Sequence, residues 1–270
     1  MHVGVVAQRG NDRAVRLAAA LDKMTDATVR FDTETAAALD RDGIEPSAMC
    51  DDDLVVSIGG DGTFLYTART TDSAPILGVN LGEVGFLNAV TPDEAPEVVA
   101  ETVAAIRDGE AIYRELTRVQ AVGDGIDLPP ALNEISVVGA QRGHGNGLDI
   151  EVQLDGETYS ETHADGVMIV TPTGSSAYNL SEGGPLVHPR ADGLVVTEMV
   201  ADGAMPPLVI APDDEITVCV SNTETAYVVA DGRSRAELEP PAELTVQRAR
   251  NPTVTVGPEL DFFAALEKLE

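Results

Sequence analysis

Apolar and polar positions follow two different patterns along this chain. In residues 1–110, short apolar runs alternate with segments whose apolar residues recur every three or four positions, as at Ala14, Leu17, Ala18 and Leu21. The runs predict buried strands and the spaced positions predict amphipathic helices. The predicted strands are residues 3–6, 28–31, 54–58 and 76–79. This alternation is typical of a parallel sheet covered by helices on both faces.

A further helix is predicted from Thr91, where a Thr-Pro-x-Glu sequence has the order of a capping box, to Gly109. After Gly109 the pattern changes to β-prone runs divided by Gly, Asp and Pro, which predicts an all-β second part with antiparallel layers. Those runs are residues 112–122, 132–138, 148–154, 167–170, 194–200, 216–220, 227–230 and 244–248. A last amphipathic helix is predicted over residues 259–270. The expected fold class is therefore α/β plus all-β, with domains over residues 1–110 and 111–254.

One carboxylate lies among three glycines where a strand meets a helix. Gly59, Gly60 and Gly62 surround Asp61, before a short helix predicted over residues 64–69. Glycine lets a ligand approach the backbone closely, and the free N–H groups of a helix N-terminus suit phosphate. Asp61 can then accept a hydroxyl proton beside that phosphate, which favours phosphoryl transfer over plain nucleotide binding. A structural turn is the alternative, because Asp-Gly occurs nine times in the chain.

A second polar motif, Thr-Pro-Thr-Gly-Ser-Ser-Ala-Tyr, occupies residues 171–178 after a predicted strand. Its hydroxyl groups and exposed amides can form a cradle for phosphate, ribose or amide groups. Tyr178 adds a flat ring with a polar tip. A Ser/Thr-rich helix cap explains the same residues equally well.

Several common sites are missing from the sequence. It contains no Gly-x4-Gly-Lys-Ser/Thr loop, no Gly-x-Gly-x-x-Gly and no Gly-x-Ser-x-Gly, which excludes P-loop, Rossmann-fingerprint, protein-kinase and nucleophile-elbow chemistry. The four histidines lack metal-ligand spacing, so no protein metal site is predicted. Cys50 and Cys219 are far apart, so neither a disulfide framework nor a zinc site is indicated.

The charge is strongly one-sided. The chain carries 46 acidic and 17 basic residues, a net charge of −29, and its only lysines are Lys23 and Lys268. A dispersed acidic surface with few lysines indicates salt adaptation, because high salt screens the self-repulsion. Nucleic acid and anionic membranes are poor partners for such a surface. No apolar stretch has the length of a membrane span, and the N-terminus resembles a strand rather than a signal peptide, so a cytoplasmic location is expected.

Taken together, these motifs resemble those of the NAD kinase family. The resemblance covers about 170 residues, in matching order and approximate spacing. It rests on GGDGTFL at 59–65, GVNLGEVGFL at 78–87, Asn133-Glu134, Asp165-Gly166 followed by TPTGSSAY, SEGGP at 181–185, and Asp231-Gly232. The first motif is shared with diacylglycerol kinases, sphingosine kinases and phosphofructokinases. The motif at 171–185 is much more specific to NAD kinases.

The resemblance implies an α/β N-terminal domain and a β-sandwich-like C-terminal domain that binds NAD, with the site between them. A last segment, about residues 255–270, returns to the first domain. The implied reaction transfers the γ-phosphate of ATP, or a phosphate of inorganic polyphosphate, to the adenosine ribose 2′-hydroxyl of NAD, making NADP. A divalent metal, Mg²⁺ by expectation, assists, and the protein self-associates as a homodimer or homotetramer.

The resemblance also implies roles for individual residues. Asp61 matches the proton acceptor, with Gly59, Gly60 and Gly62 around the phosphates. The matching NAD contacts are Asn133 and Thr173 toward adenine, Glu134 toward ribose, and Asp165, Ser176 and Ala177 toward nicotinamide, with Tyr178, Asn179, Leu180 and Ser181 completing the pocket. His163 stands where many relatives carry a basic residue, and Asp231 begins a loop that reaches the site.

Three departures from the family pattern stand out. Arg233 replaces the glutamine common after Asp-Gly, so that substrate contact can differ. Residues 198–207 lack a Pro-His pattern, which affects packing or subunit contacts more than chemistry. In the glycine-rich loop 141–147, Arg142 or His144 can hold a phosphate, although a mobile hairpin fits the turn signals better.

Two other functions remain open at this point. One is a kinase for a lipid or sugar hydroxyl that shares only the glycine-aspartate motif. The other is a nucleotide sensor of the same fold that binds NAD or NADP without making product. The presence of Asp61 favours the enzyme over the sensor.

Overall fold

The computed structural model describes residues 1–24, 26–82, 85–141, 143 and 146–267. The chain divides into two compact units, Met1–Leu116 with Thr253–Glu270, and Thr117–Pro252. No helix in the described ranges is long and apolar enough to cross a membrane.

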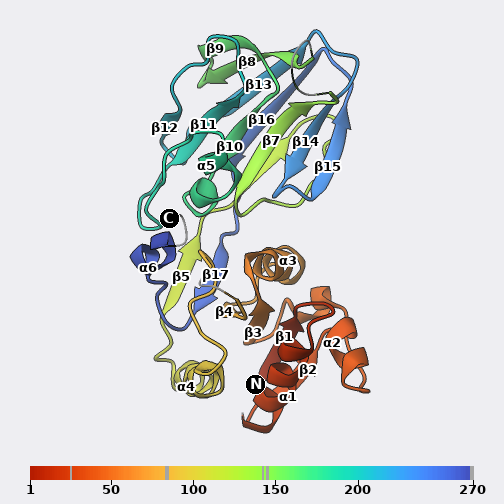
Figure 1. Ribbon diagram of the computed structural model, residues 1–270, viewed down its shortest axis with the longest axis vertical. Coiled ribbons are helices and arrows are strands. Elements are labelled where there is room, and N and C mark those ends of the chain that lie inside the picture. The colour runs from red at the N-terminus through yellow and green to blue at the C-terminus, as the bar shows by residue number, and fades with distance from the viewer. Residues whose placement is uncertain (25, 83–84, 142, 144–145, 268–270) are drawn as a thin grey trace. The chain divides into compact units, whose positions relative to one another are not determined.

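The first unit is built on a six-stranded sheet in the order β2-β1-β3-β4-β17-β5 (Figure 1). Its strands are β1 (His2–Ala7), β2 (Thr28–Phe31), β3 (Leu54–Gly59), β4 (Ile76–Asn80), β5 (Tyr113–Leu116) and β17 (Thr253–Val256). β1 to β4 run parallel, and β17 lies between β4, to which it is parallel, and the antiparallel β5. The predicted parallel sheet is confirmed, and its four expected strands are found to within one residue at each end.

Helices cover both faces of this sheet. The core on one face joins side chains of α1 (Asp12–Met24) and α4 (Ala95–Asp108) with those of the parallel strands. The other face carries α3 (Asp61–Thr71) and the 3₁₀ helix η1 (Pro46–Met49), and Thr67 of α3 donates to Ser57 of β3 at 3.2 Å. α2 (Thr33–Ala38) was not predicted, because it is short and begins at a side-chain cap, Asp32, rather than with an apolar stripe.

Two helix predictions are corrected at their ends. α4 begins at Ala95 rather than Thr91, and the Glu94 side chain instead accepts from the Thr91 amide at 3.3 Å, which is one half of a capping box. Gly109 ends α4 as predicted, with φ of 72°. The C-terminal helix α6 spans Phe262–Leu266 with Asp261 as its N-cap, so it begins later than the predicted residue 259, and residues 268–270 of the predicted helix lie outside the described residues.

The run 112–122, predicted as one β segment, forms two strands in different units. β5 pairs with β17 in the first unit, whereas β6 (Val119–Val122) pairs with β16 (Ala242–Arg248) in the second. The unit boundary therefore follows Leu116 rather than residue 110. The apolar pattern runs through both strands, so pattern alone did not reveal the division.

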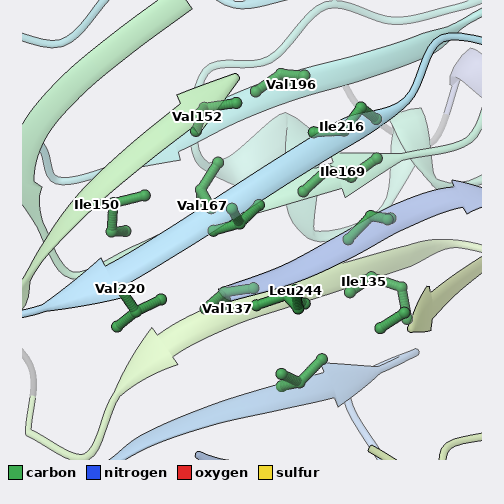
Figure 2. Close-up of a cluster of buried hydrophobic side chains, with 14 of the residues drawn as sticks. Ile135, Val137, Ile150, Val152, Val167, Ile169, Val196, Ile216, Val220 and Leu244 are labelled. Carbon is green, nitrogen blue, oxygen red and sulfur yellow. The ribbon is translucent and has the colours of Figure 1, made fainter. Parts of the chain in front are cut away.

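The second unit contains two antiparallel sheets, in the orders β12-β11-β10-β7-β14-β15 and β6-β16-β13-β8-β9. Their strands are β7 (Glu134–Gly139), β8 (Leu148–Leu154), β9 (Glu157–Ala164), β10 (Gly166–Val170), β11 (Leu194–Met199), β12 (Leu208–Ile210), β13 (Ile216–Ser221), β14 (Ala226–Ala230), β15 (Ser234–Leu238) and β16 (Ala242–Arg248). Figure 2 shows apolar side chains of both sheets meeting in one core, among them Ile135 and Val167 from the first sheet and Ile150 and Ile216 from the second.

Three strands of this unit were not predicted, namely β9, β12 and β15. Each lies at the edge of its sheet and buries few side chains, so its sequence lacks an apolar run. Two of them follow Asp-Gly turns, where Asp155, Gly156, Asp231 and Gly232 all have positive φ. Positive φ at both central residues is typical of the tight turns that join antiparallel strands.

Candidate functional site

The glycine-aspartate motif lies at the carboxyl end of the parallel sheet. Gly59 is the last residue of β3, and α3 begins at Asp61 with Gly60 as its N-cap. The helix was predicted to start at residue 64, and this earlier start places Asp61 in its first turn. The carboxyl ends of parallel strands are where α/β sheets bind their ligands. The Thr63 amide donates to the Gly60 carbonyl at 2.9 Å. The amides of Asp61 and Gly62 precede the first acceptors of the helix, which suits an anion.

The Asp61 carboxylate is held by three donors from the segment that follows β4. Its oxygens accept from the Phe86 amide at 3.0 Å, the Leu87 amide at 3.3 Å and the Asn88 side chain at 3.0 Å. Gly85 allows this approach, because a Cβ at that position would overlap the carboxylate. The motifs at 59–65 and 78–87 thus meet at Asp61, and a carboxylate with about four lone-pair sites keeps one for a further donor.

The glycines around Asp61 differ in their surroundings. A Cβ on Gly59 would overlap the Thr63 side chain, so packing alone requires glycine there. Gly60 and Gly62 have no atom within 4 Å of such a Cβ. The fold of this unit does not require those two glycines, and the space beside their backbone is open to a ligand.

The ring of Phe86 packs against the C-terminal helix of the same unit. Its centroid lies 6.2 Å from that of Phe262 in α6, with the ring planes at 61°. This edge-to-face arrangement is favourable for two aromatic rings. The C-terminal segment thus helps to hold the residue whose amide contacts Asp61.

The second unit gathers its motifs at one end of the six-stranded sheet. Glu134 begins β7 opposite Val170, the last residue of β10, so residues 171–176 continue beside Asn133. The Thr171 hydroxyl donates to the Leu132 carbonyl at 2.5 Å and accepts from the Gly174 amide at 3.1 Å. A Cβ on Gly174 would overlap the Asn133 backbone. The Asn-Glu pair and the Thr/Ser motif, predicted from separate parts of the sequence, therefore lie in contact.

Asp231 joins the same end of the sheet from β14. Its carboxylate accepts from the amides of Leu132 at 3.0 Å and Asn133 at 2.7 Å, and its own amide donates to the Glu134 carbonyl at 3.0 Å. Asp231 therefore fixes the backbone that presents Asn133 and Glu134. Arg233, in the turn after it, is exposed.

Glu134 is the most perturbed carboxyl group of this cluster. Its residue is 5% exposed, and its Oε2 atom is buried without a hydrogen-bond partner. Burial raises the pKa of Glu134 to about 7, and the neighbouring Asp231 carboxylate acts in the same direction. A buried acceptor without a partner is costly, and such groups occur at functional sites.

The remaining residues of the Thr/Ser motif form two short helices, η2 (Thr173–Ser176) and α5 (Tyr178–Ser181). Thr173, Ser176, Ala177 and Leu180 are half-buried, while Tyr178 and Ser181 are exposed.

Asn179, by contrast, is fully buried. Its side-chain nitrogen donates to the carbonyls of Ser175 and Pro185, and its oxygen accepts from the Thr197 hydroxyl. These bonds use both amide hydrogens, so the Asn179 side chain braces the loop from behind.

Asp165 and His163 lie at the other end of β10. Glu134 pairs with Val170 and Val138 pairs with Gly166, so four residues of strand, roughly 14 Å at about 3.4 Å per residue, separate the two ends. Asp165 accepts from the Gly143 amide at 2.9 Å. Arg142 and His144, candidates for holding a phosphate, lie outside the described residues.

The His163 ring contacts two acceptors, Asp149 Oδ1 at 2.7 Å and the Asn146 carbonyl at 3.0 Å. The hydrogen bond to Asp149, followed by that to Asn146, raises the pKa of His163. Two acceptors favour the protonated form of the ring, in which both nitrogens donate.

The described residues contain no group of three or more His, Cys, Asp or Glu side chains that could hold a metal ion. Mg²⁺ is usually bound by one or two carboxylates together with substrate phosphates and water. Asp61 already accepts three hydrogen bonds from the described residues, which leaves little room on it for a directly bound ion.

Sequence comparison connects these features with known proteins. Two family models match the chain, the ATP-NAD kinase N-terminal domain over residues 5–106 and the ATP-NAD kinase C-terminal domain over residues 132–257. The NAD kinase of Natronomonas pharaonis is 52% identical over 270 residues, and that of Haloarcula marismortui is 53% identical over 282 residues. Both alignments cover 100% of each chain. These relatives from halophilic archaea confirm the resemblance seen in the motifs and the expected halophilic character.

Two solved structures share the fold. The NAD kinase of Archaeoglobus fulgidus in complex with ATP superposes with a TM-score of 0.76 at 25% identity, covering 94% of this chain and 93% of its own. Yeast NADH kinase complexed with NADH has a TM-score of 0.85 at 20% identity, covering 100% and 87%. The second similarity concerns the fold alone.

Substituting Gly85 tests the packing around Asp61. We expect Gly85→Ala to displace residues 85–88 and to weaken the bonds from Phe86 and Leu87, because the added Cβ overlaps the carboxylate. Hydrogen exchange of those two amides should become faster by about tenfold or more, as expected for the loss of about 1.4 kcal/mol or more of local protection. Gly82→Ala, whose Cβ has its nearest atom at 4.0 Å, is the control. Unchanged exchange in Gly85→Ala would contradict this packing.

The raised pKa of Glu134 predicts a pH-dependent stability. A carboxyl group that titrates near 7 when folded and near 4.5 when unfolded stabilises the fold fully below pH 4.5, and this contribution is lost as pH rises through 7. The side chain in Glu134→Gln cannot titrate. The free energy of unfolding of this variant should therefore rise relative to that of the wild type between pH 5 and 8. The gain should be at most about 3 kcal/mol, since one pKa unit corresponds to about 1.4 kcal/mol. Urea denaturation at constant KCl measures the free energy of unfolding of both proteins. A difference between the two that does not change with pH would contradict the raised pKa of Glu134.

Proposed function

The chain belongs to the NAD kinase family, and from this premise we propose that Asp61 is the group that accepts the proton when NAD is phosphorylated to NADP. The observation that carries the proposal is the carboxylate held by three donors at the first turn of α3. The enzyme interpretation replaces the two alternatives considered from the motifs, since full-length relatives at about 52% identity are NAD kinases.

In the proposed mechanism the adenosine 2′-hydroxyl oxygen attacks the γ-phosphate in line with the leaving group. Asp61 accepts the hydroxyl proton through its remaining acceptor site. Its three protein donors fix the carboxylate, so little reorganisation is needed at the moment of transfer. Positioning and electrostatics supply most of the catalysis in this class of reaction.

The phosphates of the donor would lie along the backbone of Gly59 to Thr63. The open space beside Gly60 and Gly62 and the position of this backbone at the N-terminus of α3 support this placement. ATP as the donor is supported by the solved ATP complex of the Archaeoglobus fulgidus enzyme. Inorganic polyphosphate presents the same kind of terminal phosphate to this backbone.

Mg²⁺, if it takes part, would be carried mainly by the donor phosphates, because the described side chains form no cage for it. When bound there it would neutralise charge on the transferred group.

NAD would be held by the cluster around Glu134 and Asp231, at the end of the six-stranded sheet of the second unit. Glu134, with its buried oxygen lacking a partner, is the proposed ribose contact, and the backbone fixed by Asp231 presents Asn133 toward adenine together with Thr173. Ser176, Ala177, Tyr178, Leu180 and Ser181 are the proposed pocket residues on the nicotinamide side. Asn179 is proposed to support this loop from behind instead of contacting NAD.

Asp165, which was also expected on the nicotinamide side, lies with His163 at the other end of β10 from Glu134 and Thr173. We propose that the protein self-associates as a homodimer or homotetramer and that it acts in the cytoplasm.

We also propose that the second unit, residues 117–252, serves as the β-sandwich-like NAD-binding domain. Its two sheets with one shared core support that assignment.

Removing the proposed base tests the mechanism directly. Asp61→Asn keeps the size of the side chain but cannot accept a proton, so kcat should fall by roughly 10²–10⁴-fold, the usual contribution of a general base. NAD affinity, measured by calorimetry, should stay within a few-fold, because the NAD contacts lie in the second unit. Wild-type activity in this variant would remove Asp61 from the role of base.

The acidic surface predicts how activity depends on salt. NAD and ATP are anions and the protein carries a net charge of −29, so long-range repulsion slows their encounter at low ionic strength. We expect kcat/KM to be higher in molar KCl than at 0.1 M KCl, because screening shortens the range of that repulsion. A flat or falling dependence of kcat/KM on KCl, measured on protein shown to be folded at both concentrations, would contradict this expectation.

A further inference from the structure

Asn88 is a buried residue next to the proposed base that the sequence motifs did not mark. It is 2% exposed, and its side-chain nitrogen donates to Asp61 Oδ1 at 3.0 Å. It follows directly after the GVNLGEVGFL motif, which ends at Leu87. Among the donors to Asp61 that the described residues supply, Asn88 is the side chain, so a substitution can remove it without altering the backbone.

The fold holds Asn88 firmly in place. Two residues further on, Val90 forms a bridge beside β4, with its amide donating to the Gly78 carbonyl and its carbonyl accepting from the Asn80 amide. The Asn88 side chain lies directly over Gly78, where a Cβ would overlap its Oδ1 atom. Gly78, inside β4, thus leaves the space that the Asn88 amide occupies.

The orientation of this amide has an energetic cost. With its nitrogen on Asp61, its Oδ1 atom is buried and has no hydrogen-bond partner. A buried acceptor without a partner lowers stability. An apolar side chain would avoid that penalty but would remove a donor from the Asp61 carboxylate, so Asn88 offsets one unpaired acceptor with one bond to a charged group.

We propose that Asn88 is a positioning residue for the transfer step, holding the Asp61 carboxylate so that its free acceptor site faces the 2′-hydroxyl. This proposal rests on the function of Asp61 as base. The backbone donors Phe86 and Leu87 each hold one oxygen of the carboxylate, and Asn88 adds a second, shorter bond to Oδ1 that narrows its remaining motion. A misplacement of about 1 Å at a reacting group can reduce a rate by about 10²-fold.

Replacing Asn88 separates a positioning role from a structural one. Asn88→Ala removes the donor and the unpaired acceptor together, so the urea midpoint should change little, while kcat falls by about 10- to 100-fold and KM for NAD and ATP stays within about threefold. Thr67→Ala, which removes a buried hydroxyl from the same helix as Asp61, is the control and should lower the midpoint without lowering kcat. A kcat within twofold of wild type in Asn88→Ala would overturn the proposal.

A double substitution tests the pair itself. Asn88→Asp places two carboxylates in contact and should lower the urea midpoint, and Asp61→Asn combined with Asn88→Asp restores one amide and one carboxylate. We expect the urea midpoint of the double variant to recover toward that of the wild type. Its activity should not recover, because the carboxylate then stands at position 88 instead of position 61. Failure of the midpoint to recover would overturn the direct contact between the two side chains.

The failure of this proposal and that of the base role are distinguishable. Asp61→Asn alone leaves Asn88 in place, so its activity reports only on the base. A normal kcat in Asn88→Ala beside an inactive Asp61→Asn would reject positioning and leave the base role standing. An active Asp61→Asn would reject both, whereas the stability of the double variant would still report on the contact.

Discussion

The first unit depends on the hydrogen bonds that hold the Asp61 carboxylate. These bonds come from the segment that follows the neighbouring strand, β4. Asp61 stands at the end of β3, while its three donors come from residues 86–88 beyond β4. These two pieces meet because β3 and β4 are adjacent and parallel, so their carboxyl ends share one edge of the sheet. The glycines at 59, 78 and 85 are needed for this approach, since a Cβ at each would overlap a neighbouring side chain.

A similar arrangement in the second unit has the opposite electrostatic result. Asp231 uses its carboxylate to fix the backbone amides of residues 132–134, and its charge then acts on the buried Glu134 beside it. Asp61 has protein donors on both oxygens, whereas Glu134 keeps one oxygen without any. The two carboxyl groups therefore differ in how fully the described residues satisfy their oxygens.

The acidic composition acts over longer distances than these hydrogen bonds. A net charge of −29 affects encounter with anionic substrates and the stability of the compact state, both over distances that salt screens. The hydrogen bonds at Asp61 and Asp231 are short and local, so the same salt has little effect on them. The relatives from Natronomonas pharaonis and Halobacterium salinarum share about half of the residues across the whole chain.

The sequence by itself determined the elements with strong periodic patterns and the identity of the chemistry. The four parallel strands, the β-rich second part and the family followed from apolar runs and from glycine-containing motifs, because both depend on neighbours along the chain. Only the tertiary structure decided that residues 112–122 belong to two units, that Asn179 is buried behind its loop and that Asn88 donates to Asp61. Those facts depend on which distant strands pair and on which side chains share a buried space, and no local pattern in the sequence carries that information.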